Sequence, residues 1–197
     1  MADGGGITHL IRCAHILDDV ISRVPDSGWD TSTCCDGWTV RDCASHAIGV
    51  LVKFRARALG DEAVDINDGQ WAGANPVASC RHHLSRLIDV LADINPADVF
   101  DHPMFGELSF NDFYGSLAWD PLIHAWDIVD AVGISHGIDD KTARETTDRS
   151  SHLAHLVRPE DYAFNPACGD DTLNRLIESV GRTPVCGWPQ DVDDGTD

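Results

Sequence analysis

Asp120, His124 and Asp127 are the residues whose types and spacing best suit chemistry. They fall in the most apolar segment of the chain, which reads WDPLIHAWD and ends at Asp127. Side chains three and four residues apart are neighbours on one face of a helix. A carboxylate in apolar surroundings must be paired, hydrogen-bonded or bound to a metal. The spacing therefore predicts a divalent-metal site in a helical bundle, with a buried Asp120–His124 ion pair as the alternative.

His46 is the candidate for a third ligand. A catalytic metal usually takes about three protein ligands and keeps one position open. His46 lies in the middle of the helix expected over residues 39–59, among small and apolar residues. A core histidine bonded to a carbonyl would have the same surroundings. The hypothesis is a metal held by His46, Asp120 and His124, with Asp127 as a catalytic group that orients a ligand or holds a proton.

Helices must position these residues. Apolar residues recur at helical spacing, which predicts main helices over residues 6–24, 39–59, 75–92 and 109–132, and shorter ones over 139–157 and 171–180. Thr39 with Asp42 predicts a capping box, and Asn75 before a proline predicts the start of the third helix. Pro121 either bends the fourth helix or marks a start near Trp119. No strand pattern is evident, so the expected fold is all-α: a four-helix bundle with long crossover loops and additional C-terminal helices.

Composition and charge limit the classes of function. The chain of 197 residues suits one domain, expected over residues 1–188, with an acidic and disordered tail over 189–197. Its 33 acidic and 14 basic residues give a net charge of −19, which argues against a nucleic-acid partner. No apolar run reaches the ~18 residues of a membrane span, and the first residues do not resemble a signal peptide. A cytoplasmic protein without a membrane partner is expected.

The remaining titratable residues give weaker signals. His82 and His83 fit a solvated helix face, and His15 fits a satisfied core position. The sequence places nothing acidic beside His152 and His155. No C-x-x-C pair or local Cys–His arrangement occurs, so the chain's seven cysteines are expected to be reduced thiols: Cys13, Cys34, Cys35, Cys43, Cys80, Cys168 and Cys186.

Several motifs taken together point to a known family. They are CDGWTVRD at residues 35–42 followed by His46, then Asp120, His124, Trp126 and Asp127, and finally LNRL at 173–176 with GRTP at 181–184. Over most of its length the chain thus resembles the DinB-like superfamily, and within it the actinobacterial proteins similar to mycothiol-dependent maleylpyruvate isomerase. Arg182, in the last motif, is a candidate for binding a carboxylate from an exposed position.

The resemblance implies both a fold and a site. The fold would be a four-helix bundle with a long crossover between the second and third helices. The metal would be held by a histidine of the second helix and an acid-x-x-x-histidine pair, which here are His46, Asp120 and His124. The maleylpyruvate isomerase motif has glutamate where this chain has Asp120, and the shorter side chain alters the ligand geometry. Zinc is the leading candidate, nickel or iron are alternatives, and mycothiol is the candidate thiol cofactor.

Three functions remain open from the sequence. The first is a metal-dependent thiol S-transferase or isomerase acting on a small organic metabolite, since a metal lowers the pKa of a bound thiol or water. The second is a metal-dependent enzyme that uses Lewis-acid or hydrolytic chemistry without a thiol. The third is a non-catalytic bundle that binds a metal or ligand. The expected partner is a small molecule, such as a low-molecular-weight thiol, and the expected state is a monomer or homodimer.

Overall fold

The computed structural model describes residues 5–61, 64–66, 70–102, 105–150 and 172–183. Helices form the body of the molecule: α1 (Gly6–Arg23), α2 (Val40–Leu59), α3 (Pro76–Ala92), α4 (Phe110–Leu117), α5 (Trp119–Val132), α6 (Asp140–Ser150) and α8 (Thr172–Ser179). A single 3-10 turn, Asp26–Gly28, follows α1. The all-α bundle predicted from the sequence is confirmed.

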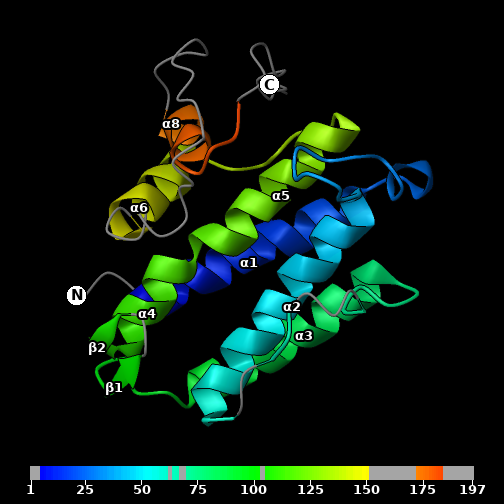
Figure 1. Cartoon of the computed structure of the whole chain (residues 1–197). Coiled ribbons are helices and arrows are strands. Elements are labelled where there is room, and N and C mark those ends of the chain that lie inside the picture. Colours follow the sequence, from blue (N-terminus) through cyan, green and yellow to red (C-terminus); the bar gives the residue numbers. More distant parts are fainter. Residues whose placement is uncertain (1–4, 62–63, 67–69, 103–104, 151–171, 184–197) are drawn as a thin grey trace, which may run out of the picture.

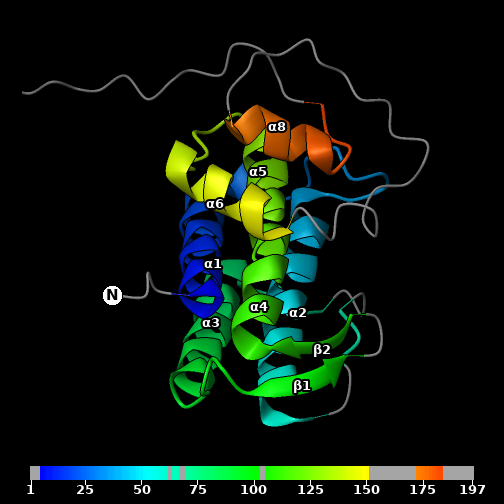
Figure 2. The same ribbon diagram turned by 90° about the vertical axis from the view of Figure 1, so that its left-hand side faces the viewer.

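The long helices α1, α2 and α3 run side by side with the α4–α5 pair (Figures 1 and 2). α5 packs against both α1 and α2, and α6 lies across α4 and α1. One core fills the space between the helices, with Leu10, Ile48, Leu87, Leu122 and Ile123 among its fully buried side chains. The bundle therefore brings residues of α2 directly against residues of α5.

Local signals set the start of α2 and α3 as predicted. Thr39 accepts a hydrogen bond from the backbone of Asp42, and the Asp42 side chain accepts one from the backbone of Thr39. Asn75 caps α3 through the backbone of Ala78. Each cap satisfies amides that the first turn of a helix leaves unpaired, so both helix starts are well defined. The α2 cap fixes the register that places His46 in mid-helix.

The segment expected as a helix over residues 109–132 is divided in two. α4 ends at Leu117 and α5 begins at Trp119, with Ala118 between them. Pro121 has no backbone N–H, so it cannot donate to the carbonyl of Leu117 as a continuous helix requires. A helix start near Trp119, rather than one bent helix, is what the structure contains. Asp120 consequently lies in the first turn of α5.

Two short strands were not predicted. β1 (Val99–His102) pairs with β2 (Gly106–Ser109) as an antiparallel hairpin, with Val99 opposite Ser109. The expectation that this part is only a loop was wrong, because four-residue strands without a fully buried side chain give too short a pattern to detect. The hairpin lies at the end of the bundle opposite α8 (Figure 2). It does not contribute to the candidate site.

The C-terminal part is described only in part. α6 begins where expected, and the continuation of that helix to residue 157 lies outside the described residues, as does the acidic tail at 189–197. α8 agrees with the helix predicted over 171–180. Among the described helices, none combines the length and the hydropathy needed to cross a membrane.

Candidate metal centre and thiol cluster

His46, Asp120 and His124 come together between α2 and α5. One ligand atom from each side chain lies within 4.8 Å of the other two. His46 projects from the middle of α2, while Asp120 and His124 lie one turn apart on α5. The structure thus brings together the three residues that the sequence proposed as ligands.

The ring of Trp38 lies beside the two histidine rings. The His46 ring centroid lies 4.9 Å from that of His124 in an edge-on arrangement, and 4.8 Å from that of Trp38. The Trp38 ring centroid is also 5.9 Å from that of His124. Trp38 precedes the α2 cap, so the loop before α2 supplies an apolar wall beside the imidazoles. Such a wall limits water and fixes ring orientation.

Asp120 has an oxygen without a protein partner. Its Oδ1 atom is buried and forms no hydrogen bond within the described residues. Buried carboxylate oxygens are nearly always hydrogen-bonded or bound to a cation, because an unpaired one costs free energy. The unpaired atom belongs to the same carboxylate that approaches His46 and His124. This donor set of two imidazoles and one carboxylate fits a borderline divalent ion such as zinc.

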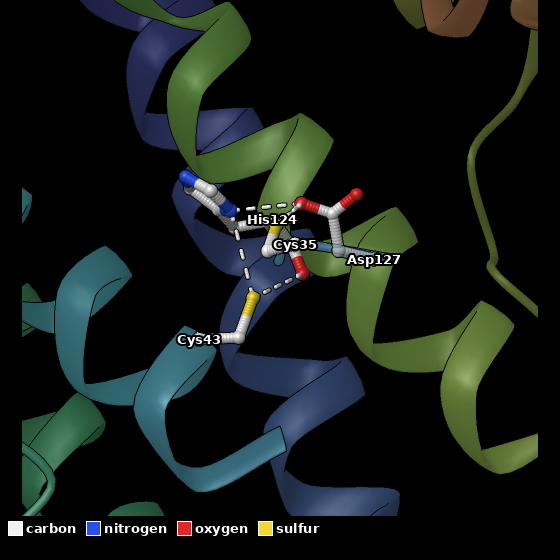
Figure 3. A group of neighbouring side chains, drawn as sticks. All are labelled: Cys35, Cys43, His124 and Asp127. Carbon is white, nitrogen blue, oxygen red and sulfur yellow. Dashed lines mark hydrogen bonds and ion pairs between the residues drawn. The ribbon is translucent and has the colours of Figure 1, made fainter. Parts of the chain in front are cut away.

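Asp127 holds His124 in position. The Asp127 side chain is 0% exposed, and its Oδ2 atom lies 2.9 Å from His124 Nδ1. This contact requires the Nδ1 hydrogen to point at the carboxylate, which leaves Nε2 as the atom able to bind a cation. Figure 3 shows the other ring nitrogen of His124 pointing away from Asp127 and Cys43. Asp127 therefore orients the ring.

Arg182 neutralises the charge of Asp127. Its Nε donates to Oδ1 at 3.1 Å and its Nη2 to Oδ2 at 3.0 Å, while Nη1 donates to the Val180 carbonyl at 3.0 Å. Arg182 follows α8, and its side chain is 19% exposed. The sequence prediction of an exposed Arg182 was wrong, although a carboxylate is its partner. Bidentate pairing of this kind is geometrically specific and strong when buried.

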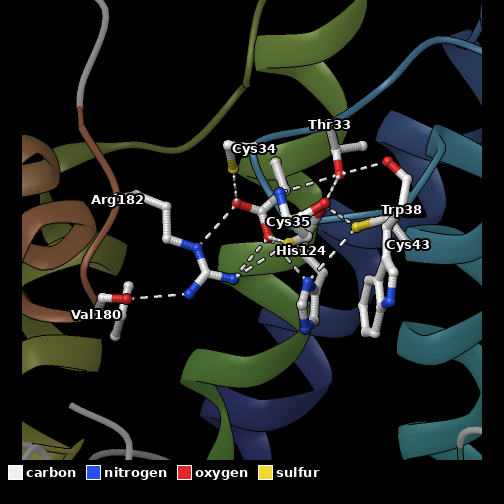
Figure 4. A network of polar contacts seen from close by, with 9 residues as sticks. Thr33, Cys34, Cys35, Trp38, Cys43, His124, Val180 and Arg182 are labelled. Atoms are coloured by element: carbon white, nitrogen blue, oxygen red, sulfur yellow. Dashed lines mark hydrogen bonds and ion pairs between the residues drawn. The ribbon is translucent and has the colours of Figure 1, made fainter. Parts of the chain in front are cut away.

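Thiols lie around the same carboxylate, and Figure 4 shows Cys34, Cys35 and Cys43 gathered near His124 and Arg182. Cys34 Sγ donates to Asp127 Oδ1 at 3.0 Å, and Cys35 Sγ donates to Oδ2 at 3.2 Å. Cys43 of α2 lies with its Sγ 3.5 Å from His124 Nδ1. Cys35, Cys43, His124 and Asp127 form a second group whose ligand atoms lie within 4.8 Å of one another. His124 thus belongs to both groups.

Hydrogen bonds and burial shift the pKa values of the clustered thiols and of His124 in different directions. Hydrogen bonds from Cys34 and Cys43 lower the pKa of the Cys35 thiol, against the opposing effect of burial, and Arg182 lowers it further. The pKa values of Cys34 and Cys43 rise, first through their hydrogen bonds to Cys35 and then through burial. Burial alone would lower the pKa of His124, but Asp127 and Cys35 raise it to about 10.

A closed loop carries the two neighbouring cysteines to α5. The Thr33 amide donates to the Trp38 carbonyl at 2.9 Å, and the Trp38 amide donates to the Cys35 carbonyl at 3.0 Å. An isolated bridge joins Ser32 to Thr39. The cluster was not predicted from the sequence, because its cysteines and its histidine are far apart along the chain. The sequence feature that could have indicated the cluster is the position of Cys35 directly before the motif Asp36-Gly37-Trp38.

The sequence also singled out histidines outside the proposed ligand set. His15 is exposed, so its assignment as a core residue was wrong; His9, two turns earlier on α1, is the buried one. His82 is exposed on α3 as expected, whereas His83, also expected on a solvated face, is half-buried with its ring centroid 6.0 Å from that of Trp71. His152 and His155 lie outside the described residues.

The fold and the site define a class: a DinB-like helical bundle with a histidine–carboxylate cluster between its second and fifth helices. Comparison with known families agrees with this class. The family model described as the mycothiol maleylpyruvate isomerase N-terminal domain matches residues 10–129, which is more than half of the chain. The chain belongs to this family, and the matched part includes His46, Asp120, His124 and Asp127. Searches of curated proteins and of solved structures found no match.

Proposed function

We propose that this protein is a metal-dependent enzyme that acts on a small organic metabolite. It would activate a low-molecular-weight thiol, such as mycothiol, either for transfer to the metabolite or for isomerisation of the metabolite. His46, Asp120 and His124 would hold the divalent ion, with zinc the leading candidate. The observation that carries the proposal is the convergence of these three side chains, with an unpaired buried oxygen on Asp120. Family membership supports it independently.

The donor set supports metal binding over a purely structural role. A structural ion pair would saturate the Asp120 carboxylate, yet Oδ1 has no hydrogen-bond partner within the described residues. His124 is already oriented by Asp127, which is the arrangement that metal-binding histidines commonly have. Three protein ligands leave a coordination position for a thiol, a water or a substrate oxygen.

A divalent ion at this position would supply Lewis acidity, which lowers the pKa of a bound thiol or water. The chain's own residues have other tasks. Asp127 keeps the Nδ1 hydrogen of His124 directed at itself, and Arg182 holds the Asp127 carboxylate in place with two hydrogen bonds. Trp38 and the loop before α2 shield the imidazoles on one side.

One observation favours a second candidate, a metal-dependent enzyme without a thiol cofactor. Mycothiol-like thiols need polar groups that recognise them, and within the described residues Arg182 is a cation in contact with the cluster. Both faces of its guanidinium fork are engaged, by Asp127 and by the Val180 carbonyl. A cofactor carboxylate would have to compete with Asp127 for it. The metal would then act on water or on a substrate carbonyl.

Metal addition to chelator-treated protein tests the metal part of the proposal. Zinc or nickel should raise the melting temperature of the wild type and remain bound after desalting. His46→Ala and Asp120→Asn should lose both effects, while His15→Ala, an exposed histidine on α1, should keep them. A wild type that gains no stability and retains no metal would contradict the proposal.

Mycothiol then separates the two candidate functions. Zinc-loaded wild type should bind mycothiol and accelerate its reaction with an electrophile such as a maleimide, whereas Asp120→Asn should not. If zinc-loaded protein neither binds the thiol nor accelerates its reaction, the thiol-dependent function is wrong and the second candidate stands.

A further inference from the structure

Cys35 and Cys43 form a close thiol pair contributed by two different elements. Cys35 belongs to the closed loop before α2, and Cys43 belongs to the first turns of α2. Their sulfur atoms lie within 4.8 Å of each other, and the two thiols interact. A disulfide needs the sulfurs to approach to about 2 Å, so the two side chains must move closer together before they can bond.

The two thiols differ in access. Cys35 is half-buried, whereas Cys43 is fully buried beneath it. Within this pair, a solvent-borne oxidant therefore reaches Cys35 before Cys43, which lies on the inner side. The adjacent Cys34 is exposed, and its Sγ is hydrogen-bonded to Asp127. This order, an accessible thiol with a shielded neighbour, is the arrangement of cysteines that form disulfides after oxidation.

We propose that Cys35 and Cys43 form a reversible disulfide when the protein meets a hydroperoxide. The Cys35 sulfur attacks the peroxide, giving a sulfenic acid and releasing an alcohol or water. The Cys43 sulfur then attacks the Cys35 sulfur, forming the S–S bond and releasing one water. The two thiols are oxidised by two electrons and the O–O bond is reduced. Two molecules of a small thiol restore both thiols and leave as their own disulfide.

Cys34 is a less suitable partner for Cys35 although it is adjacent in sequence. A bond between neighbouring cysteines requires a distorted backbone, and this backbone is held: the Cys35 amide donates to Thr33 Oγ1 at 3.2 Å and its carbonyl accepts from the Trp38 amide at 3.0 Å. Cys34 Sγ is also engaged with Asp127 Oδ1, the oxygen that Cys35 does not use.

A second metal ion is a less suitable use of the same thiols. The Cys35, Cys43, His124 and Asp127 group has the composition of a thiolate-rich site. Arg182, however, donates twice to Asp127 and lies 3.5 Å from Cys35 Sγ, so a fixed positive charge already occupies the group. A divalent cation there would be repelled at short range. Disulfide formation needs no cation and is compatible with Arg182.

Oxidation would change the contacts that the two thiols make with His124 and Asp127. The disulfide removes the hydrogen that Cys35 donates to Asp127 Oδ2 and draws Cys43 Sγ from its contact with His124 Nδ1. An effect of the disulfide on metal affinity rests on the proposed function, whereas formation of the disulfide does not depend on that function. The disulfide is therefore tested on metal-free protein.

Peptide mapping of chelator-treated full-length protein tests the bond directly. Trypsin cleaves after Arg41, so Cys35 falls in the peptide of residues 24–41 and Cys43 in that of residues 42–53. After treatment with hydrogen peroxide and alkylation of free thiols, the wild type should yield these two peptides joined, two hydrogens lighter than their sum. Reduction should separate them. Cys13 and Cys80, buried on other helices, should stay reduced.

Single variants identify the partner. Cys34→Ser should keep the joined peptides, and both Cys35→Ser and Cys43→Ala should lose them. Circular dichroism and thermal melting establish that each variant is folded before oxidation. A joined product that survives in Cys35→Ser, an internal bond between Cys34 and Cys35, or a wild type in which Cys35 is overoxidised without joining would each overturn the proposal.

Discussion

In the described part of the chain, two clusters around a buried histidine contain similar residue types but differ in their interactions. The first, between α2 and α5, contains His124 with Cys43 and Asp127. The second, between α1 and α6, contains His9, whose Nε2 lies 2.9 Å from Thr146 Oγ1 and 3.7 Å from Cys13 Sγ. Both place a histidine, a thiol and an acid together in the interior. Residue types alone therefore do not identify a candidate metal centre.

The difference lies in the partners of the acids. Asp127 meets His124 directly at 2.9 Å, and the pKa of His124 rises to about 10. Glu145 is held by Arg12 at 2.8 Å and by Arg149 at 3.0 Å. Its nearest oxygen is 3.4 Å from His9 Nδ1, and burial lowers the pKa of His9 to about 4.

The clusters also differ in what converges on them. Beside His124 lie a second histidine and a carboxylate with an unpaired oxygen, drawn from two helices. The His9 cluster places Arg12 and Arg149 around its acid, and these cations would repel a metal. The feature that marks the candidate metal site is the convergence of three ligand side chains from two helices, with no cation of the described residues placed among them.

Removing Arg182 should have the largest effect on stability. Arg182→Met leaves the fully buried Asp127 without its cation, so the free energy of unfolding should fall by about 3 kcal/mol in urea denaturation. In the other cluster, Arg12→Met leaves Glu145 with Arg149 and partial solvent access, and should cost about 1 kcal/mol or less. Adding Asp127→Asn to Arg182→Met should recover part of the loss. Equal losses of unfolding free energy in Arg182→Met and Arg12→Met would contradict the difference between the two clusters.

Acid should weaken the His9 cluster. The folded-state pKa of His9, about 4, lies below its ordinary value of 6.5, chiefly through burial, so below pH 6.5 the unfolded chain binds a proton that the folded chain does not. Its contribution is complete above pH 6.5 and is lost as the pH falls to 4, by up to about 3 kcal/mol. Urea denaturation of wild type and His9→Gln at several pH values isolates this difference. Parallel curves would show that His9 is not held neutral.

Metal response should distinguish the two histidines. A metal at one hundred times its Kd stabilises a folded protein by about 2.7 kcal/mol. That gain, measured by thermal melting with and without zinc, should be lost in His124→Ala and retained in His9→Gln. A gain that persists without His124 would assign the metal to other residues.

Loss of one hydroxyl should have the smallest effect. Thr146→Val keeps the shape of the side chain but removes the acceptor for His9 Nε2, so the free energy of unfolding should fall by about 1–2 kcal/mol. Ser150→Ala, which removes a partly buried hydroxyl bond on the same helix, is the control and should cost less. A cost no greater than the control would mean that His9 finds another partner.

Local signals explain what the sequence revealed. The capping box at Thr39 and the Asn75 cap set the starts of α2 and α3, and period and proline position located α5. Asp120 and His124 could be proposed because they are spaced one turn apart on a buried helix. His46 could be proposed from its position in the middle of α2 and from the family resemblance.

The thiol cluster and the hairpin could not be predicted in this way. Cys34 lies 93 residues from Asp127 in sequence, and Arg182 lies 55 residues from it. Their meeting depends on how the loop before α2 closes and on where α8 docks, which no local pattern encodes. The hairpin strands have only four residues each and no fully buried side chain, so their pattern is too short to stand out in the sequence.

An anomalous-difference map from zinc-soaked crystals tests the central claim most directly. The account predicts one peak between α2 and α5, about 2.0–2.2 Å from His46, from Asp120 and from His124 Nε2. A peak bound instead by Cys35 and Cys43, or no peak between α2 and α5, would contradict it.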